Sequence, residues 1–179
     1  MGQELKIGDV APDFNLPGVD GDEHSLADFK DKKIIVVIFS CNHCPYVQAY
    51  EDRIISLQEE FKEKGVIFIA INSNDDRNYP EDSFDNMVKR AKKKGFNFFY
   101  LRDQSQSIAR AYGASHTPQI FVFDERRNLR YTGKIDDNWR EPGKVRERYL
   151  RDAILALLEE KEIRNPETHA IGCTIKWAR

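Results

Sequence analysis

Two runs of consecutive apolar residues predict buried β-strands near the centre of the chain. Lys33–Ser40 (KIIVVIFS) and Val66–Asn72 (VIFIAIN) are rich in β-branched residues and do not alternate with polar ones. That pattern is typical of strands buried on both faces of a sheet. Between them, apolar residues recur at helical spacing over Cys44–Lys64, and Gly65 ends the helix. The order of strand, helix and strand predicts parallel pairing through a crossover.

The same alternation continues along the chain and then gives way to a hairpin. A polar loop (SNDDRNYPED) comes first, and the later patterns predict a helix over Ser83–Lys94, a strand at Asn97–Leu101, a helix over Gln104–Tyr112, a hairpin of Gln119–Asp124 with Leu129–Ile135, and an amphipathic helix over Val145–Glu160. Upstream, two extended pieces flank a turn, and Ser25 caps a helical turn through Lys30. The tail Ala170–Arg179 shows no clear pattern. We therefore expect an α/β fold with a mixed central sheet flanked by helices.

Length and composition fit one globular domain over residues 1–179, because 40% of the residues are apolar and 32% are charged. The net charge of −2 gives no field that would attract nucleic acid or an anionic membrane. The longest apolar run, Ile34–Phe39, is too short to span a bilayer, and the first residues lack the apolar core of a signal peptide. We expect a cytoplasmic protein with no nucleic-acid or membrane partner.

The chain has three cysteines, Cys41, Cys44 and Cys173. An odd number in a reducing compartment argues against a structural disulfide framework and favours catalytic, sensing or metal-binding thiols. Cys41 and Cys44 lie in FSCNHCPYVQAY, at the turn from a buried strand into a helix. Their spacing fits a redox pair, but it also fits two unreactive buried thiols or a metal clip completed by Cys173 or His169.

A cysteine attacks as its thiolate, and with a pKa of about 8.5 only roughly 3% of a free thiol is ionised at neutral pH. Cys41 follows the strand directly, so we expect it near the N-cap, where unpaired N–H groups and the helix dipole favour an anion. His43 can add a positive charge or a hydrogen bond beside the same sulfur, or it can be a solvated residue. Cys44 is close enough to form a disulfide with Cys41.

Several motifs resemble the thioredoxin-fold redoxin (AhpC/TSA-like) superfamily. The fragment APDFNLPGVDGDEHSLADFK is similar to the opening of redoxins, SCNHCPY and SHTPQIFVFD resemble the CxxC and the cis-proline loop of thioredoxins, and GCTIKW resembles the closing motif of a peroxiredoxin-like thioredoxin subfamily. The resemblance implies a thioredoxin-like fold with an N-terminal β-hairpin extension and a peroxiredoxin-like inserted helix. It also implies that Pro118 is a cis proline facing the cysteine pair. Thr117 and His116 would then border a site where a substrate peptide adds as a strand.

The chain departs from both relatives at its candidate site. Thioredoxins carry a buried acid at the position of Ile35, so another group must accept the proton, and Asp136, Asp137 and Glu141 are the acids we consider. Aligning Cys44-Pro45 with the end of the peroxiredoxin motif makes Cys44 the peroxidatic candidate. The proline, threonine and arginine of peroxiredoxins then fall on Val37, Cys41 and Pro118. Efficient peroxide reduction is therefore less favoured than disulfide exchange.

Two further residues are candidates on weaker grounds. Cys173 can resolve a mixed disulfide, bond a partner chain, or pack under the tail. Asn74 follows a central parallel strand, on the edge where crossover folds place their sites, although ordinary turn chemistry explains it equally well.

Three hypotheses follow. The first is a thiol–disulfide oxidoreductase in which Cys41 attacks and Cys44 resolves, with His43 tuning the thiol. The second is a peroxide reductase or sensor acting through Cys44. The third is a metal- or protein-binding module without turnover. Under the first, we expect protein disulfides or small thiols and disulfides as substrates, and a thioredoxin-reductase-like or glutathione electron donor. We also expect no cofactor, no bound metal, and a monomer or homodimer.

Overall fold

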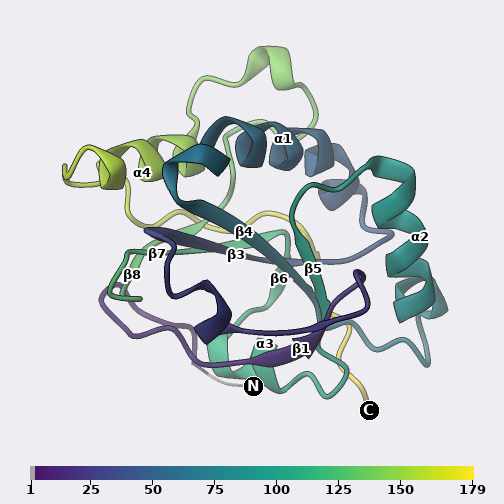
Figure 1. Cartoon of the computed structure of the whole chain (residues 1–179). Coiled ribbons are helices and arrows are strands. Elements are labelled where there is room, and N and C mark those ends of the chain that lie inside the picture. The colour runs from purple at the N-terminus through teal and green to yellow at the C-terminus, as the bar shows by residue number, and fades with distance from the viewer. Residues whose placement is uncertain (1–2) are drawn as a thin grey trace.

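The computed structural model describes residues 3–179, and its centre is a five-stranded mixed sheet (Figure 1). The strands are β3 (Ile34–Ser40), β4 (Val66–Asn72), β5 (Phe99–Arg102), β7 (Gln119–Phe123) and β8 (Leu129–Gly133). Their order across the sheet is β5–β4–β3–β7–β8. Strands β5, β4 and β3 are parallel, whereas β7 and β8 add an antiparallel edge. The predicted alternation followed by a hairpin is confirmed.

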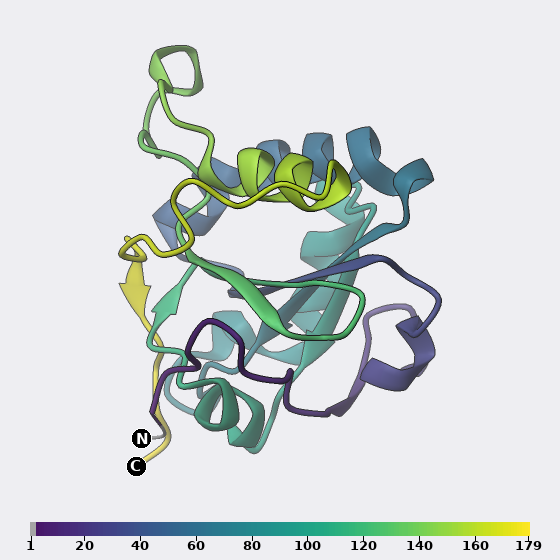
Figure 2. The same ribbon diagram turned by 90° about the vertical axis from the view of Figure 1, so that its left-hand side faces the viewer.

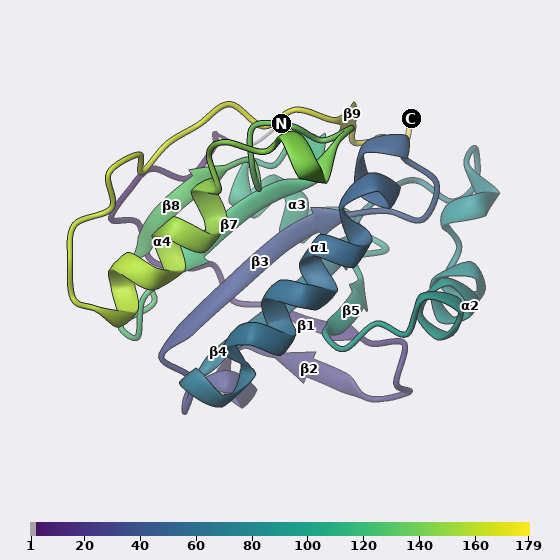
Figure 3. The same cartoon turned by 90° about the horizontal axis from the view of Figure 1, so that it is seen from above.

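Helices cover both faces of the sheet (Figures 1 and 3). They are α1 (Pro45–Phe61), α2 (Phe84–Lys94), α3 (Ser107–Tyr112) and α4 (Tyr149–Leu158). Helices α1 and α4 lie across one face, α3 lies on the other, and α2 flanks the edge beside β5. Because side chains alternate along a strand, β3 supplies two cores: Ile35 and Val37 pack on the α3 side, and Val36 and Ile38 on the α1 side.

The chain before β3 adds the predicted hairpin. Strands β1 (Asn15–Pro17) and β2 (Glu23–Ser25) pair antiparallel. The backbone N–H of Ser25 donates to a carboxylate oxygen of Asp28 at 2.9 Å, which starts the 3₁₀ turn Leu26–Phe29. The hairpin extension is therefore confirmed, and one further helix, α2, lies between β4 and β5.

Glycine and a left-handed glutamine set two helix boundaries. Gly65 (φ 79°) follows the 3₁₀ turn Lys62–Lys64 at the end of α1, as predicted. Helix α3 starts later than predicted because Gln106 has φ 66° and its side chain turns toward the C-terminal tail. Helix α4 also starts later than predicted, at Tyr149, because the backbone of Val145 is extended (φ −64°, ψ 129°).

The C-terminal tail has a structure that its sequence did not indicate. Strand β9 (Cys173–Thr174) pairs antiparallel with β6 (His116–Thr117), in a small sheet separate from the central one. Figure 2 shows the yellow C-terminal strand beside β6. Two-residue strands carry no periodic pattern, so only the folded partner reveals them. Within residues 3–179, none of the helices combines the length and the apolar content needed to cross a bilayer.

Candidate active site

The first turn of α1 fixes the two CxxC sulfurs. Cys44 is the N-cap of α1, so the expectation that Cys41 takes this position is wrong. The reason is Pro45, whose fixed φ and missing N–H suit the first helical position. Cys41 lies upstream, in the loop that leaves β3. Both side chains are buried, with 2% of Cys41 and 1% of Cys44 exposed.

All three cysteines of the chain meet at this point as free thiols. The Sγ atoms of Cys44 and Cys173 are 2.7 Å apart, which is longer than a disulfide bond of about 2.05 Å but within reach of one. Cys41 Sγ lies 3.6 Å from Thr117 Oγ1, and Cys44 Sγ lies 3.5 Å from the Thr117 carbonyl oxygen. The structure thus brings Cys41, Cys44, Thr117 and Cys173 together.

The surroundings shift the pKa values of the two CxxC thiols in opposite directions. A hydrogen bond from Cys41 is the largest effect that lowers the pKa of Cys44. The Cys173 thiol and the backbone N–H groups of Val47 and Cys173 act in the same direction, while burial opposes them. The neighbouring Cys44 sulfur, then burial, then the charge of Asp82 raise the pKa of Cys41. These shifts favour the thiolate on Cys44, at the helix N-terminus, over one on Cys41.

The surroundings also raise the pKa of Cys173. Burial first, and then the hydrogen bond and the charge of Cys44, raise the pKa of Cys173 to about 11. Lys176 acts in the opposite direction. Cys173 therefore stays protonated near neutral pH and can donate to the Cys44 thiolate.

A fully buried acid, Asp82, completes the site, and sequence reasoning missed it. Its carboxylate accepts hydrogen bonds from the backbone N–H of Asn42 at 2.7 Å and from Asn74 Nδ2 at 2.9 Å, and its Oδ2 lies 2.7 Å from His43 Nδ1. Its position in the sequence could have indicated it, because Asp82 is the last residue of the polar loop that follows β4. The carboxyl ends of parallel strands are where such folds place their sites.

The acids named from the sequence lie elsewhere. Asp136 accepts a hydrogen bond from Tyr50 at 2.6 Å and pairs with Arg53 at 2.8 Å, so this carboxylate serves α1 and not the cysteines. Asp137 and Glu141 are exposed. Ile35 is buried in the apolar core, so the thioredoxin acid is indeed missing there.

His43 is half-buried and faces acids as well as sulfur. Its Nε2 is 3.8 Å from Glu81 Oε1, and its ring stacks on Tyr79 at a centroid distance of 6.2 Å. One ligand-type atom each from Cys41, His43 and Asp82 lies within 4.8 Å of the others. The predicted metal clip instead used Cys173 or His169, and His169 is exposed and outside this group. His43 and Asp82 are already paired with each other, which suits proton transfer.

The proline loop has the expected form but a different neighbour. The Thr117–Pro118 peptide bond is cis, as the resemblance implied. However, the backbone of β6 is already paired: His116 lies opposite Thr174, and Thr117 opposite Cys173. The edge predicted to receive a substrate peptide is thus occupied by the C-terminal strand of the same chain. The His116 ring forms a hydrogen bond with Ser115 Oγ at 2.7 Å.

Asn74 supports the site without touching the sulfurs. Its side chain donates to Asp82, and its Oδ1 accepts a hydrogen bond from the backbone N–H of Lys176 at 2.9 Å. Asn74 therefore links the buried acid to the tail that carries Cys173.

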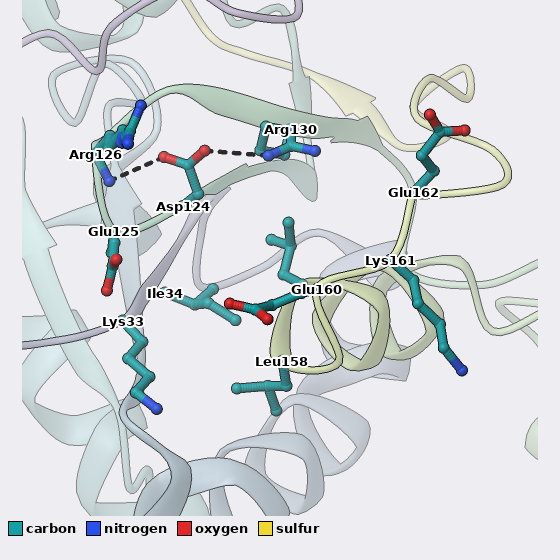
Figure 4. Close-up of a pocket in the computed structure, with 11 residues that line it drawn as sticks. Lys33, Ile34, Asp124, Glu125, Arg126, Arg130, Leu158, Glu160, Lys161 and Glu162 are labelled. Carbon is teal, nitrogen blue, oxygen red and sulfur yellow. Dashed lines mark hydrogen bonds and ion pairs between the residues drawn. The ribbon is translucent and has the colours of Figure 1, made fainter.

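A cleft of about 450 Å³ lies at the other end of β3 (Figure 4). Charged residues of both signs line it, and Asp124 accepts hydrogen bonds there from the Arg126 backbone and from Arg130. It contains none of the cysteines, because Ile34, at the start of β3, forms its wall whereas Cys41 follows the end of that strand. The candidate site is thus the thiol cluster and not this cleft.

The Redoxin family matches residues 6–148, which include Cys41, Cys44, Asp82 and Pro118. The chain belongs to the Redoxin family. Together with the order of its strands, this membership confirms the thioredoxin-like fold. Cys173 lies beyond the matched residues.

Relatives of this Redoxin-family protein carry both expected activities in their names. It is 25% identical to the thiol-disulfide oxidoreductase ResA of Geobacillus thermodenitrificans, over 68% of this chain and 65% of the relative. It is 27% identical to the peroxiredoxin Bcp of Escherichia coli, over 61% of this chain and 65% of the relative. The match thus spans about 65% of each curated relative. A solved structure of an uncharacterized conserved protein from Geobacillus kaustophilus is 40% identical, with a TM-score of 0.92 and coverage of 97% and 93%.

Proposed function

We propose that this protein is a thiol–disulfide oxidoreductase whose redox pair is Cys41 and Cys44. The observation that carries the proposal is the environment of Cys44: an N-cap sulfur surrounded by N–H and S–H donors, with a lowered pKa, beside a second cysteine of the same turn. A stabilised thiolate next to a resolving thiol is what disulfide exchange requires. The similarity to ResA supports the same reaction class.

The mechanism reverses the roles expected from the sequence. The Cys44 thiolate attacks one sulfur of a disulfide presented to it, so a mixed disulfide forms and the other sulfur leaves as a thiolate that takes a proton from solvent. Cys41 then loses its proton to the His43–Asp82 pair and attacks Cys44 Sγ. The Cys41–Cys44 disulfide forms, and the second product thiol is released. Cys41 is the poorer first nucleophile because its hydrogen bond with Cys44, its burial and the negative charge of Asp82 all raise its pKa.

Equilibration with glutathione buffers tests this proposal. In the Cys173→Ser variant, we expect a Cys41–Cys44 disulfide that forms and disappears as a two-electron couple when the ratio of glutathione to glutathione disulfide is varied. Acid trapping and peptide mapping measure the fraction of this disulfide. In Cys41→Ser/Cys173→Ser, glutathione should remain on Cys44. In the matched Cys44→Ser/Cys173→Ser, much less should remain on Cys41. A wild-type protein that forms no internal disulfide in any buffer would overturn the proposal.

Peroxide reduction is a second candidate, favoured by one observation. Cys44 precedes Pro45 at the start of a helix and has a lowered pKa, and the chain is similar to Bcp. Peroxide would oxidise Cys44 to a sulfenic acid, which Cys41 would condense with to release water. Among the described residues, no arginine donates a hydrogen bond to Cys44, so the group that polarises peroxide in peroxiredoxins has no counterpart here. Rapid peroxide consumption that is lost in Cys44→Ser would favour this candidate.

Substrate, donor and location are also proposed. Because β9 occupies the β6 edge, we expect the substrate disulfide to be on a small molecule or a protruding protein loop rather than on an extended peptide. Glutathione or a thioredoxin-reductase-like system is the expected electron donor. Three free cysteines without a disulfide framework support action in the cytoplasm.

A further inference from the structure

Cys173 separates the buried cysteine pair from the surface. Cys41 and Cys44 are almost completely buried, whereas Cys173 is the partly exposed member of the three. The sulfurs of Cys44 and Cys173 are 2.7 Å apart although the residues are 129 positions apart in the chain. In this conformation, an external thiol or disulfide therefore contacts Cys173 more readily than Cys44.

The tail holds Cys173 firmly in this place. After Cys173, the backbone N–H of Ile175 donates to the Ser115 carbonyl at 2.8 Å, and Ile175 is 3% exposed. Trp177 packs against the core, where the Arg110 guanidinium lies 5.1 Å from its ring centroid. The tail also pairs with Asn74 through Lys176, as described above. These contacts anchor the strand, so Cys173 is a fixed part of the site and not the end of a loose segment.

Cys173 lies on a strand that is added to the edge of β6. Its partner in the β6–β9 pairing is Thr117, the residue directly before the cis proline Pro118. Gly172 allows the close approach, since a Cβ there would lie 2.0 Å from the Thr117 carbonyl oxygen. The chain therefore presents its own thiol to Cys44 in the manner in which a bound peptide would present its disulfide.

We propose that Cys173 is the exchange thiol through which external thiols and disulfides react with the buried Cys41–Cys44 pair. This inference rests on the proposed redox activity of the pair. It deepens that activity by naming the residue that contacts the external reactant.

In the reductive direction, two external thiols reduce the Cys41–Cys44 disulfide through Cys173 in three steps. The Cys173 thiol loses its proton and attacks Cys44 Sγ, so the Cys44–Cys173 bond forms, the Cys41–Cys44 bond breaks, and Cys41 takes up the proton. An external thiolate then attacks Cys173 Sγ, forming a mixed disulfide and releasing Cys44 as a thiolate. A second external thiol attacks the external sulfur of that mixed disulfide, releasing an external disulfide and the Cys173 thiol. The reverse steps carry a substrate disulfide to the pair.

The acidity of the leaving thiol and the accessibility of the sulfurs favour this route. Attack on a disulfide is faster when the leaving thiol has a low pKa, and Cys44 is the acidic sulfur of the Cys44–Cys173 bond. Attack also depends on which sulfur is accessible, and Cys173 is the exposed one. Both conditions direct an external thiolate to Cys173 Sγ.

Rapid mixing with glutathione tests the proposal. Reduction of the oxidised protein by glutathione, and oxidation of the reduced protein by glutathione disulfide, should each slow by about 10-fold or more in Cys173→Ser. Thr174→Ser, on the same short strand, is the matched control and should react at the wild-type rate. Cys173→Ser reacting at the wild-type rate in both directions would overturn the proposal.

Disulfide mapping gives a second readout that does not depend on rates. Oxidised by glutathione disulfide, Cys41→Ser should form a Cys44–Cys173 disulfide. Cys44 and Cys173 remaining unlinked in this variant would overturn the exchange role, even if the wild type forms Cys41–Cys44 normally. Failure of the underlying redox activity looks different, because then the wild type itself forms no Cys41–Cys44 disulfide in the same buffers.

Discussion

Cys41 and Cys44 belong to one turn of the chain, yet their neighbours give them different chemistry. The sulfur of Cys44 accepts a hydrogen bond from a backbone N–H group in the first turn of α1, whereas the sulfur of Cys41 lies near the negative charge of Asp82. A helix N-terminus stabilises an anion and a buried carboxylate opposes one, so the two effects add to separate the pair. The hydrogen bond between Cys41 and Cys44 is the largest effect on both thiols, and Asp82 and Cys173, which lie far away in the sequence, add to the difference between their pKa values.

The ultraviolet absorbance of the Cys44 thiolate tests this assignment of the two cysteines. The lowered pKa of Cys44 means that the reduced protein should carry one thiolate at neutral pH, which is lost as the pH falls through the folded-state pKa of Cys44. Cys173→Ser should keep this absorbance, and Cys44→Ser should lose it. Retention in Cys44→Ser together with loss in Cys41→Ser would contradict the assignment.

Asp82 gives a second prediction, in which two effects of one substitution oppose each other. Asp82→Asn removes the charge that raises the pKa of Cys41, which favours attack by about 10-fold for each pKa unit. It also removes the proposed proton acceptor, a loss of about 10²–10⁴-fold in typical general-base catalysis. The second effect is larger, so glutathione should leave the Cys44 mixed disulfide at least ~10-fold more slowly.

Single-turnover release of glutathione, measured in the Cys173→Ser background after mixing with glutathione disulfide, checks the effect of Asp82→Asn. Asp85→Asn, an exposed acid at the start of α2, is the control and should resolve at the wild-type rate. The donors that Asp82 now satisfies also predict a loss of about 1–3 kcal/mol in the free energy of unfolding, measured in urea. Wild-type release from Asp82→Asn would exclude this acid from the reaction.

At the scale of elements, the short pair β6–β9 decides where Cys173 lies, and Gly172 controls it. A Cβ at Gly172 would overlap backbone atoms of Thr117, which cannot move as a flexible side chain would. Gly172→Ala should therefore displace β9 and reduce Cys44–Cys173 disulfide formation in the Cys41→Ser background, as measured by peptide mapping. Gly143→Ala, with no atom within 4 Å of the added Cβ, is the control and should leave the yield unchanged. Equal yields in both variants would contradict this role of Gly172.

Long elements were predictable from the sequence, and short or remote ones were not. The apolar runs of β3 and β4 and the helical spacing of α1 specify their own type, and the alternation specifies a mixed sheet. The N-cap was misplaced because Pro45 outweighs proximity to the strand. The β6–β9 pair and the Asp82 contacts depend on residues that meet only in the folded chain, so no local pattern contains them.

The whole molecule assembles its site from four distant parts of the chain. Strand β3 is buried on both faces and delivers Cys41 to the carboxyl edge of the sheet, where the loop after β4 supplies Asp82. The proline loop closes the opposite side, and the tail, beyond the residues that match the Redoxin family, adds Cys173. The residues that match the Redoxin family thus hold Cys41, Cys44 and Asp82, and the tail places Cys173 beside Cys44.

Because of this arrangement, we expect the two possible disulfides to stabilise the folded protein by different amounts. Cys41–Cys44 closes a very short loop, whereas Cys44–Cys173 joins residues 129 positions apart. In the chain-entropy description, the short loop stabilises the folded state by about 2 kcal/mol and the long loop by about 5 kcal/mol. The difference of about 3 kcal/mol follows from loop length alone, because longer loops restrict the unfolded chain more.

Urea unfolding of two variants measures this difference. Cys173→Ser can form only Cys41–Cys44, and Cys41→Ser is expected to form only Cys44–Cys173. Subtracting the free energy of unfolding of the reduced form from that of the oxidised form cancels the effect of each substitution itself. Oxidation should increase the free energy of unfolding more in Cys41→Ser than in Cys173→Ser. An equal or smaller gain there would mean that the Cys44–Cys173 bond strains the fold, and an external thiol would then find this bond easier to reduce than its loop length implies.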